Sequence, residues 1–369
     1  MGPTRAYINH SNLLHNYNLI KKAVAPAKVM CVVKANAYGH DSVAVSKTLV
    51  ENGVEYLGVA FAEEGIELRK AGIDTPILVF GAQLADFLDD HLEYNLDITL
   101  TSEHQIQILT KLCREKNKIA KVHIKIDTGM NRVGFLVQEA KKMIDRIFAE
   151  PCIQVIGVYS HLSSSDEEDL TYTRGQIERF NQIKSYITET YSAEILFHLA
   201  NSGAIMRLPE SYHDMVRPGV MLYGNPPGPD FRLDWDLEEV MSFVSRVTLI
   251  KTVDAGEPVS YSRRYYTKAK TNLAVIPVGY ADGYNRHLTN KGSVLIRGKR
   301  HPVAGTVCMD QIIVDLGSET DIQVGDDVVL MGQQINTVIS NVEISRILNT
   351  IPYEITCAVS RRVPRIHLK

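Results

Sequence analysis

The feature that most constrains the fold of this chain is a regular alternation of short apolar runs with amphipathic stretches. Eight runs have the length and composition of strands, and segments with helical spacing such as 62–72 and 174–191 lie between them. The runs are Lys28–Val33, Glu55–Ala60, Pro76–Phe80, Leu96–Leu100, Lys121–Ile126, Ile153–Tyr159, Glu194–Phe197 and Asp214–Val216. Eight such repeats predict an α/β fold, a (β/α)8 TIM barrel, with an open doubly wound sheet as the alternative.

The pattern changes near residues 225–236 (NPPGPDFRLDWD), where proline and glycine become dense. Beyond this segment, short β-like runs alternate with glycine-containing turns, and NVEISRILNT is a single helical stretch. We therefore divide the chain into a barrel over residues 1–230 and a mainly β domain over residues 231–369. The strand-like residues 4–8 are compatible with pairing in either domain.

Composition excludes several classes of partner. The formal net charge is −3 and charges of both signs are interleaved, so the chain offers no basic stripe for nucleic acid and no polybasic patch for a membrane. No signal-peptide pattern opens the chain, and no apolar run approaches the ~20 residues that span a bilayer. The five cysteines show no C-x-x-C spacing. We expect a cytoplasmic protein with reduced cysteines, a small-molecule substrate and no metal site.

Polar residues follow the carboxyl ends of five predicted strands, and these ends meet at one pole of a barrel. They are Lys34, Asp127, His161, His198, Asn201 and Arg217. Each alone would be read as a structural polar group, but their common position favours a functional site. Lys34 follows the buried run Val29–Val33, where partial desolvation would lower its pKa and free the amine to form a Schiff base.

Eight motifs, in their order along the chain, resemble those of the alanine racemases. They are VVKANAYGH, HIKIDTGMNRVGF, HLANSGA, VRPGVMLYG, VSYSRRY, PVGYADGYNR, AGTVCMDQ and PYEITCAVSRRVPR. The resemblance covers nearly the whole chain. It implies an isomerase that interconverts L-alanine and D-alanine with pyridoxal 5'-phosphate, built from a barrel and a β domain and active as a head-to-tail homodimer. Whether the product would supply the cell wall as a peptidoglycan precursor or serve alanine breakdown stays open.

Carried over residue by residue, the resemblance makes Lys34 the lysine that holds the cofactor and one of two catalytic acid/base groups. Tyr261 of the partner subunit would be the second, with His161 orienting its phenol. Racemisation removes a proton from one face of Cα and delivers another to the opposite face, so two groups on opposite sides are the natural arrangement.

The same comparison implies the contacts of the cofactor. Arg217 would face the pyridine nitrogen, and because a guanidinium has donors and no acceptor, that nitrogen would stay unprotonated. We expect a weaker electron sink and therefore fewer side reactions. The residues implied for the phosphate are Tyr38, Ser202, Tyr353 and the backbone of Gly219 and Val220, and Asn201 completes the cofactor-binding set.

Arg132 and Met309 would bind the substrate, with Met309 coming from the partner subunit. Lys125 matches a lysine that is carbamylated in many relatives. The residues Asp166, Tyr280 and Arg286 match the polar entryway of the family, above a gate formed by Tyr261 and Tyr353. Two departures affect loops near the site: Ser262 stands where glycine is frequent, and HLSSSDE at residues 161–167 replaces a more apolar version.

Other functions leave different signatures. A serine or broad-spectrum amino-acid racemase would be expected to relieve the gate at Tyr353, which is intact here. A non-catalytic cofactor-binding barrel would need neither a second domain nor Tyr261. A related barrel decarboxylase would be expected to show a glycine-rich phosphate loop and a catalytic cysteine, whereas Cys308 has no evident base beside it.

Overall fold

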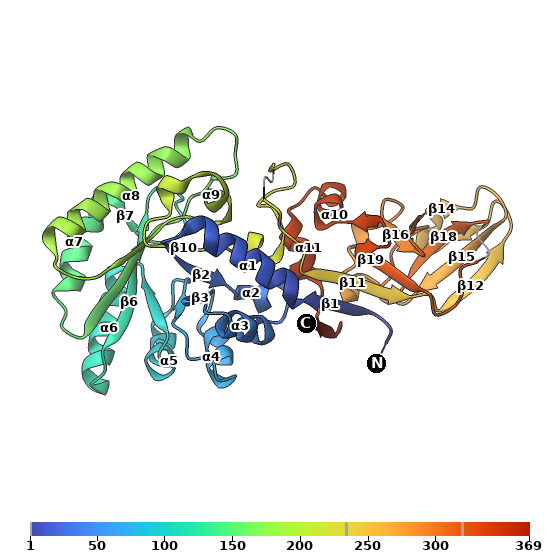
Figure 1. Ribbon diagram of the computed structural model, residues 1–369. Coiled ribbons are helices and arrows are strands. Elements are labelled where there is room, and N and C mark those ends of the chain that lie inside the picture. The colour runs from blue at the N-terminus through green and yellow to red at the C-terminus, as the bar shows by residue number, and fades with distance from the viewer. Residues whose placement is uncertain (1, 233–234, 319–320) are drawn as a thin grey trace.

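The protein folds into two lobes that follow each other along the chain (Figure 1). This computed structural model describes residues 2–232, 235–318 and 321–369. Residues 233 and 234 of the proline-rich segment, and residues 1, 319 and 320 of the two proposed domains, lie outside the described residues. Within the described ranges, no helix is long and apolar enough to cross a membrane.

The first lobe is a closed parallel barrel of eight strands. Around the barrel they follow the order β5, β4, β3, β2, β10, β9, β8 and β6, and pairing between β5 and β6 closes the ring. The strands are β2 (Lys28–Val32), β3 (Tyr56–Val59), β4 (Ile77–Val79), β5 (Asp97–Leu100), β6 (Ala120–Asp127), β8 (Ile153–Tyr159), β9 (Leu196–His198) and β10 (Met215–Val216). The predicted barrel is confirmed, and the open sheet is wrong because it would leave β5 and β6 unpaired.

Helices cover the outside of this barrel (Figure 1). They are α1 (His10–Val24), α3 (Ser42–Glu51), α4 (Ala62–Lys70), α5 (Leu88–Glu93), α6 (Glu103–Lys116), α7 (Val137–Phe148), α8 (Thr171–Thr190) and α9 (Ser202–Arg207), with the short turn α2 (Lys34–Tyr38) after β2. In α6, Ser102 caps the first turn by accepting from the Gln105 amide, and Asn117 ends the helix in the left-handed conformation. Ile106, Leu109 and Cys113 recur at helical spacing and are buried against the strands.

The second lobe is mainly β, as predicted. Its larger sheet has the order β17, β16, β19, β11, β1 and β21, with β20 paired to β19, and a smaller sheet has the order β12, β15 and β18. The elements are β11 (Met241–Arg246), β12 (Leu249–Val253), β13 (Pro258–Val259), β14 (Tyr265–Tyr266), β15 (Thr271–Ile276), β16 (Ser293–Ile296), β17 (Lys299–Pro302), β18 (Ile312–Gly317), β19 (Asp327–Gln334), β20 (Thr337–Ile339), α10 (Asn341–Leu348), α11 (Pro352–Ala358) and β21 (Arg365–Leu368).

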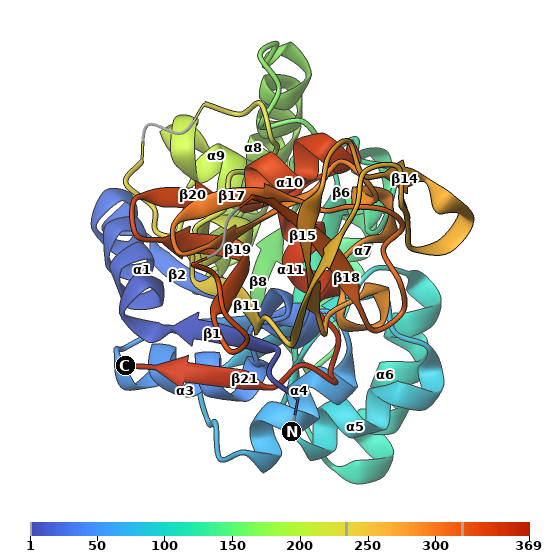
Figure 2. The same ribbon diagram turned by 90° about the vertical axis from the view of Figure 1, so that its right-hand side faces the viewer.

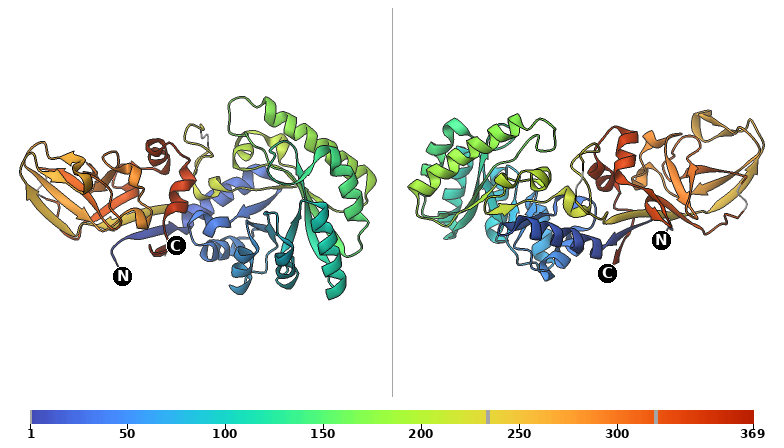
Figure 3. Two further views of the ribbon diagram at one scale, coloured as in Figure 1. Left: turned by 180° about the vertical axis from the view of Figure 1, so that it is seen from behind. Right: turned by 45° about the horizontal axis from the view of Figure 1, so that its top comes forward.

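Both ends of the chain join this second lobe. Strand β1 (Arg5–Asn9) pairs antiparallel with β11 and parallel with β21. The first strand-like residues therefore belong to the sheet of the C-terminal lobe, although α1 directly after them covers the barrel. Figure 3 shows the C-terminus at the junction of the lobes and the N-terminus beneath the C-terminal lobe, so the chain crosses this junction after β1 as well as after the barrel.

Helix α11 joins the second lobe to the barrel pole at which β2 ends. Gly39, which follows α2, lies so close to α11 that a Cβ atom there would lie 2.2 Å from the Thr356 carbonyl oxygen. The Arg365 guanidinium donates from Nε to the Gly39 carbonyl at 3.0 Å. Figure 2, with the C-terminal lobe in front, shows α11 between that lobe and the barrel. The contact fixes where side chains of α11 stand relative to Lys34.

Candidate active site

Lys34 begins an unusual turn at the carboxyl end of β2. Residues Ala35–Tyr38 all have φ near +50°, and Gly39 continues the turn at φ +89°. A left-handed conformation costs about 1–2 kcal/mol for each non-glycine residue, so surrounding contacts must hold it. The Ala35 amide donates to Glu64 Oε1 at 2.6 Å, and His40 Nδ1 lies 2.8 Å from the Ala37 carbonyl. This turn sets the directions of the Lys34 and Tyr38 side chains.

The environment of Lys34 favours a neutral amine. Burial lowers the pKa of Lys34, the positive charges of Arg132 and Arg217 lower it further, and Glu64 opposes them in part. A neutral amine is the nucleophilic form of lysine. The structure thus gives Lys34 the property that its position after a buried strand predicted.

Arg217 follows β10 and is 4% exposed. Its Nη2 donates to the Ser160 carbonyl at 2.7 Å and the Leu199 carbonyl at 2.9 Å, while Nη1 lies 3.1 Å from His198 Nδ1. Burial lowers the pKa of Arg217 to about 10. Within the described ranges no carboxylate forms an ion pair with it. The site therefore presents a fixed cation that has donors only.

His161, which follows β8, lies beside this cation. Its Nδ1 is 3.4 Å from Arg217 Nη2. Burial and the charge of Arg217 hold the pKa of His161 well below its ordinary value, with Lys125, Arg132 and Lys34 acting in the same direction. A neutral imidazole can accept a hydrogen bond from an approaching hydroxyl.

Hydroxyl groups and backbone amides gather near the starts of α9 and of the turn at 220–223. Ser202 Oγ accepts from the Gly219 amide at 3.0 Å and lies 3.4 Å from the Met221 amide. A Cβ atom at Gly219 would lie 2.7 Å from Tyr38 Oη, so only glycine lets the backbone approach this phenol so closely. Val220 follows in the same buried segment.

Two further predicted residues adjoin this group. Asn201 caps α9 by accepting from the Ala204 amide at 3.1 Å and from Ser165 Oγ at 2.7 Å. Tyr353, on α11, is half-buried, and its ring lies 6.2 Å from that of Tyr38 in an edge arrangement. The C-terminal lobe thus adds a hydroxyl to the barrel pole.

Strand β6 places several polar side chains at alternate positions. Lys125 is 7% exposed, and its Nζ lies 4.7 Å from the centre of the Tyr159 ring. Burial and the charge of Arg217 hold the pKa of Lys125 well below its usual value. At the end of the strand, Asp127 Oδ2 accepts from the Arg132 amide at 3.1 Å and fixes the loop that carries the exposed Arg132 side chain.

Four predicted residues belong to the C-terminal lobe and stand apart from Lys34. They are Tyr261, Tyr280, Arg286 and Met309, all exposed, Tyr261 by 69% and Met309 by 52%. No hydrogen bond, ion pair or ring contact connects any of them to Lys34 or Arg217 in the part of the chain described. The Tyr261 loop lies between β13 and β14, and Figure 1 shows β14 in the part of this lobe farther from the barrel.

Two of these loops hold each other in place. The Tyr280 amide donates to the Cys308 carbonyl at 3.1 Å, and the Ala281 amide donates to the Met309 carbonyl at the same distance. Arg362 connects both loops through Asp282 at 2.8 Å and Asp310 at 2.7 Å. Tyr280 and Met309 are therefore presented together. Asp166, by contrast, is exposed on the barrel after β8, where its charge raises the pKa of Tyr353 in addition to burial.

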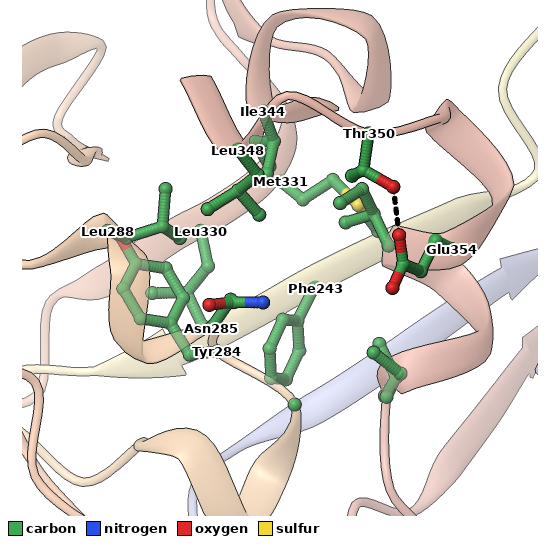
Figure 4. Close-up of a pocket in the computed structure, with 14 residues that line it drawn as sticks. Phe243, Tyr284, Asn285, Leu288, Leu330, Met331, Ile344, Leu348, Thr350 and Glu354 are labelled. Carbon is green, nitrogen blue, oxygen red and sulfur yellow. Dashed lines mark hydrogen bonds between the residues drawn. The ribbon is translucent and has the colours of Figure 1, made fainter. Parts of the chain in front are cut away.

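An apolar pocket in the C-terminal lobe is a separate feature (Figure 4). Its lining includes Phe243, Tyr284, Leu288, Met331 and Ile344. Thr350 donates to Glu354 at its rim, as the dashed line shows. None of the predicted site residues lines this pocket, and its lining is mainly apolar, with Tyr284 and Glu354 as its titratable groups. The chemistry resides at the barrel pole.

The motifs did not identify some residues that shape the site. Glu64 holds the left-handed turn, and Tyr159 lies under both Lys125 and Arg217, with Arg217 Cζ 5.3 Å from its ring centre. An available signal for Tyr159 was its place at the carboxyl end of the buried run 153–159. Glu64 gave no comparable signal, because its bond to Ala35 depends on the packing of α4 against the turn after β2.

A partly buried lysine of lowered pKa, a donor-only cation and a cluster of hydroxyls at the pole of a (β/α)8 barrel define a barrel enzyme of amine chemistry. Residues 8–227 match the family described as alanine racemase, N-terminal domain, and residues 240–367 match alanine racemase, C-terminal domain. The chain belongs to the alanine racemase family and is an isomerase, which confirms the resemblance found in its motifs.

Individual relatives agree over their full lengths. Alanine racemase 2 of Caldanaerobacter subterraneus subsp. tengcongensis is 42% identical over 99% of this chain and 95% of its own. Alanine racemase of Carboxydothermus hydrogenoformans is 41% identical over 100% of both chains. The solved structure of alanine racemase from Clostridium difficile 630 superposes with a TM-score of 0.95 at 36% identity, covering 100% of this chain and 96% of that one.

Proposed function

We propose that the protein interconverts L-alanine and D-alanine, with pyridoxal 5'-phosphate as its cofactor and a homodimer as its active form. The observation that carries the proposal is the pairing of Lys34, whose pKa is lowered, with the donor-only Arg217 at one barrel pole. A reactive amine can hold the cofactor as a Schiff base, and a cation with donors only leaves the ring nitrogen unprotonated, which limits side reactions. Family membership supports the same assignment.

The residues present fit the cofactor. Gly219 lacks the side chain that would press on Tyr38 Oη, so backbone amides and hydroxyls come together where a phosphate dianion would bind. In this proposal Tyr38, Ser202, Tyr353, Gly219 and Val220 hold the phosphate, with Asn201 supporting Ser202 from the adjacent position. Arg217 faces the ring nitrogen, and Lys34 holds the cofactor covalently. When bound, the cofactor withdraws electrons from Cα of the amino acid and makes its hydrogen acidic.

Lys34 is proposed to move a proton on one face of Cα. Tyr261 of the partner subunit is proposed to act on the other face, because Tyr261 is 69% exposed and has no contact with Lys34 of its own chain in the described residues. The neutral imidazole of His161 would accept from that phenol and orient it. A second copy of the chain is then required to complete each site.

Substrate recognition is assigned to groups at the mouth of the site. Arg132 would pair with the substrate carboxylate, supported by Met309 of the partner subunit. Tyr353 would limit the room beyond the alanine methyl together with Tyr261 of the partner subunit. Asp166, with Tyr280 and Arg286 of the partner subunit, would form the polar entryway. A gate of two tyrosines leaves little room beyond the methyl group and so favours alanine over larger side chains.

The decisive test is racemisation of L-alanine and L-serine by the purified protein, with a visible absorption spectrum of the bound cofactor. We expect the absorption of a lysine-bound cofactor and a kcat/KM for alanine that exceeds the value for serine by at least about tenfold. Equal values would favour a broad-spectrum racemase. A cofactor spectrum without turnover of either amino acid would refute the proposal.

The two-base arrangement has its own test in deuterated water. Tyr261→Phe should slow Cα hydrogen exchange selectively from the enantiomer whose hydrogen faces the phenol, while exchange on the Lys34 side stays measurable. The exposed Tyr266→Phe, on β14, is a control that should leave both enantiomers unaffected. Equal residual exchange from both enantiomers in Tyr261→Phe would indicate a single base.

A further inference from the structure

A continuous chain of hydrogen bonds runs through the barrel from Arg217 to Asp97. Arg217 Nη1 lies 3.1 Å from His198 Nδ1, and His198 Nε2 lies 2.9 Å from His123 Nδ1. His123 Nε2 is 3.1 Å from Tyr56 Oη and 3.7 Å from Asp97 Oδ2, and the Tyr56 hydroxyl donates to Asp97 Oδ2. These residues come from five strands. Arg217 directly follows β10, and β9, β6, β3 and β5 carry His198, His123, Tyr56 and Asp97 in that order.

Burial makes every bond of this chain consequential. Both imidazoles are fully buried, and the other three side chains are at most 5% exposed. A polar group that loses its partner in such a place is not rescued by water, and the loss costs about 1–3 kcal/mol. The loss of one of these hydrogen bonds therefore weakens the others, and the network is stabilised as one unit.

A glycine on the neighbouring strand leaves room for the imidazole of His123, the central residue of the hydrogen-bond chain. Gly157 faces His123 across the ladder between β6 and β8. A Cβ atom at Gly157 would lie 2.4 Å from His123 Nδ1. The φ of Gly157 is not positive, so the backbone alone does not call for glycine there. A side chain there would meet the ring of His123 and also the Leu196 carbonyl oxygen, which would lie 2.9 Å from the Cβ atom.

The two ends of the chain fix its direction. A guanidinium has donors only, so His198 Nδ1 accepts from Arg217, and His198 Nε2 carries the hydrogen that it donates to His123 Nδ1. His123 then donates from Nε2 to Tyr56, which donates to Asp97, because an ionised carboxylate has acceptors only. Burial and Arg217 hold the pKa of His198 well below its usual value, and burial and Asp97 raise the pKa of Tyr56. Both groups stay neutral.

We propose that His198, His123, Tyr56 and Asp97 are positioning residues that hold the guanidinium of Arg217 in one orientation toward the ring nitrogen of the cofactor. This inference rests on the proposed function for the role of Arg217. A guanidinium has five N–H groups. The bonds to His198, Ser160 and Leu199 occupy three of them and leave hydrogens on Nε and Nη1 for the cofactor. The charge of Asp97, carried through polarised hydrogen bonds, strengthens His198 as an acceptor.

The direction of the chain is measurable without cofactor or substrate. In the apoprotein labelled with nitrogen-15 only at histidine, long-range proton–nitrogen spectra at neutral pH should show both buried imidazoles neutral, with hydrogen on Nε2 and none on Nδ1. His123→Gln and His198→Gln each remove one set of signals and so assign the two rings. Hydrogen on Nδ1 of either ring, or a charged ring, would overturn the proposal even if the enzyme racemises alanine normally.

A matched pair of substitutions then separates positioning from packing. His123→Gln keeps an acceptor toward His198 and a donor toward Tyr56, whereas His123→Leu fills a similar volume with neither. We expect His123→Leu to lower kcat about tenfold or more with little change in KM, and His123→Gln to stay within about threefold of wild type. Within this pair, the fraction of turnovers that end in pyridoxamine phosphate should rise in His123→Leu and stay at the wild-type value in His123→Gln.

A milder variant keeps the test open if His123→Leu does not fold. Tyr56→Phe removes one hydroxyl and leaves the two imidazoles, so it should lower kcat less than His123→Leu, in the same direction and again without a change in KM. Equal kcat values for His123→Leu and His123→Gln, or a Tyr56→Phe variant with wild-type kcat and an unchanged product distribution, would assign these residues to packing alone. Wild-type protein that lacks racemase activity would instead refute the proposed function. The nitrogen-15 spectra would then still test the direction of the hydrogen bonds between Arg217 and Asp97.

Discussion

The Lys125 amine lies 4.7 Å from the centre of the Tyr159 ring, inside the barrel and close to the charge of Arg217. Burial and that charge keep the pKa of Lys125 well below the ordinary lysine value, so a neutral amine is available at lower pH than on the surface. A neutral amine can add carbon dioxide and release a proton to solvent, and the resulting carbamate anion would pair with Arg132 and offset the excess of positive charge.

We therefore expect carbon-13 from labelled bicarbonate to attach to Lys125. The label should increase as pH rises through the lowered pKa, because only the neutral amine reacts. Lys125→Met should abolish the carbon-13 resonance, whereas Lys121→Met, at an exposed position of the same strand, should keep it. A wild-type protein without label at saturating bicarbonate would show that this amine is unmodified.

Replacement of Lys34 should remove catalysis. Lys34→Ala should lower kcat by at least about a thousandfold, because it deletes both the covalent anchor and one acid/base. In wild-type apoprotein, the rate of cofactor uptake should rise with pH and reach half its maximum below 10.5, since burial and Arg132 lower the pKa of Lys34. Lys47→Ala, at an exposed position of α3, should change neither quantity. Racemisation near the wild-type rate in Lys34→Ala would exclude Lys34 from the chemistry.

Sharing of the site between subunits predicts complementation. Lys34→Ala chains and Tyr261→Ala chains should each be inactive, and a mixed dimer should contain one doubly damaged site and one intact site. Random exchange of equal amounts gives about half mixed dimers, so activity should return to about a quarter of the wild-type value per chain. If mass measurement shows that subunits exchange and activity stays absent, both groups act within one chain.

The donor-only character of Arg217 predicts reaction specificity. Arg217→Glu places a carboxyl group where it can share a proton with the ring nitrogen, which strengthens the electron sink and favours transamination. Accumulation of pyridoxamine phosphate per turnover should increase at least about tenfold. Arg217→Lys keeps a cation without an acceptor and should not show this increase. An unchanged product distribution in Arg217→Glu would remove the hypothesis.

Contact between the lobes predicts a steric effect at Gly39. Gly39 and Gly72 have similar positive φ values of +89° and +84°, but only Gly39 has neighbours within 4 Å of an added Cβ. Gly72→Ala should lower the free energy of unfolding by about 1 kcal/mol through its backbone alone. Gly39→Ala should cost about 2–4 kcal/mol and also lower kcat/KM, because α11 and Tyr353 must move. Equal costs in denaturant unfolding would contradict this role for the contact.

Local patterns of the sequence were enough to predict the barrel and the character of the second lobe. Apolar runs such as 29–33 and 153–159 and the amphipathic stretches between them have periods that a few neighbouring residues determine. The ordered motifs identified the family and located Lys34, Arg217 and Ser202 at strand ends, because the carboxyl ends of barrel strands share one pole whatever their partners are.

What the sequence determined by itself is therefore the eight barrel strands, the mainly β character of the second lobe and the residue types at strand ends, whereas helix α11 was missed because only one helical stretch was predicted there. Only the tertiary structure decided which distant elements meet: β5 with β6 to close the barrel, β1 with β11 and β21, and His198 with His123 in the interior. It also decided that Tyr261 lies away from Lys34 within one chain. These relationships depend on contacts between residues far apart in sequence, and the periodicity of a single strand carries no information about its partner.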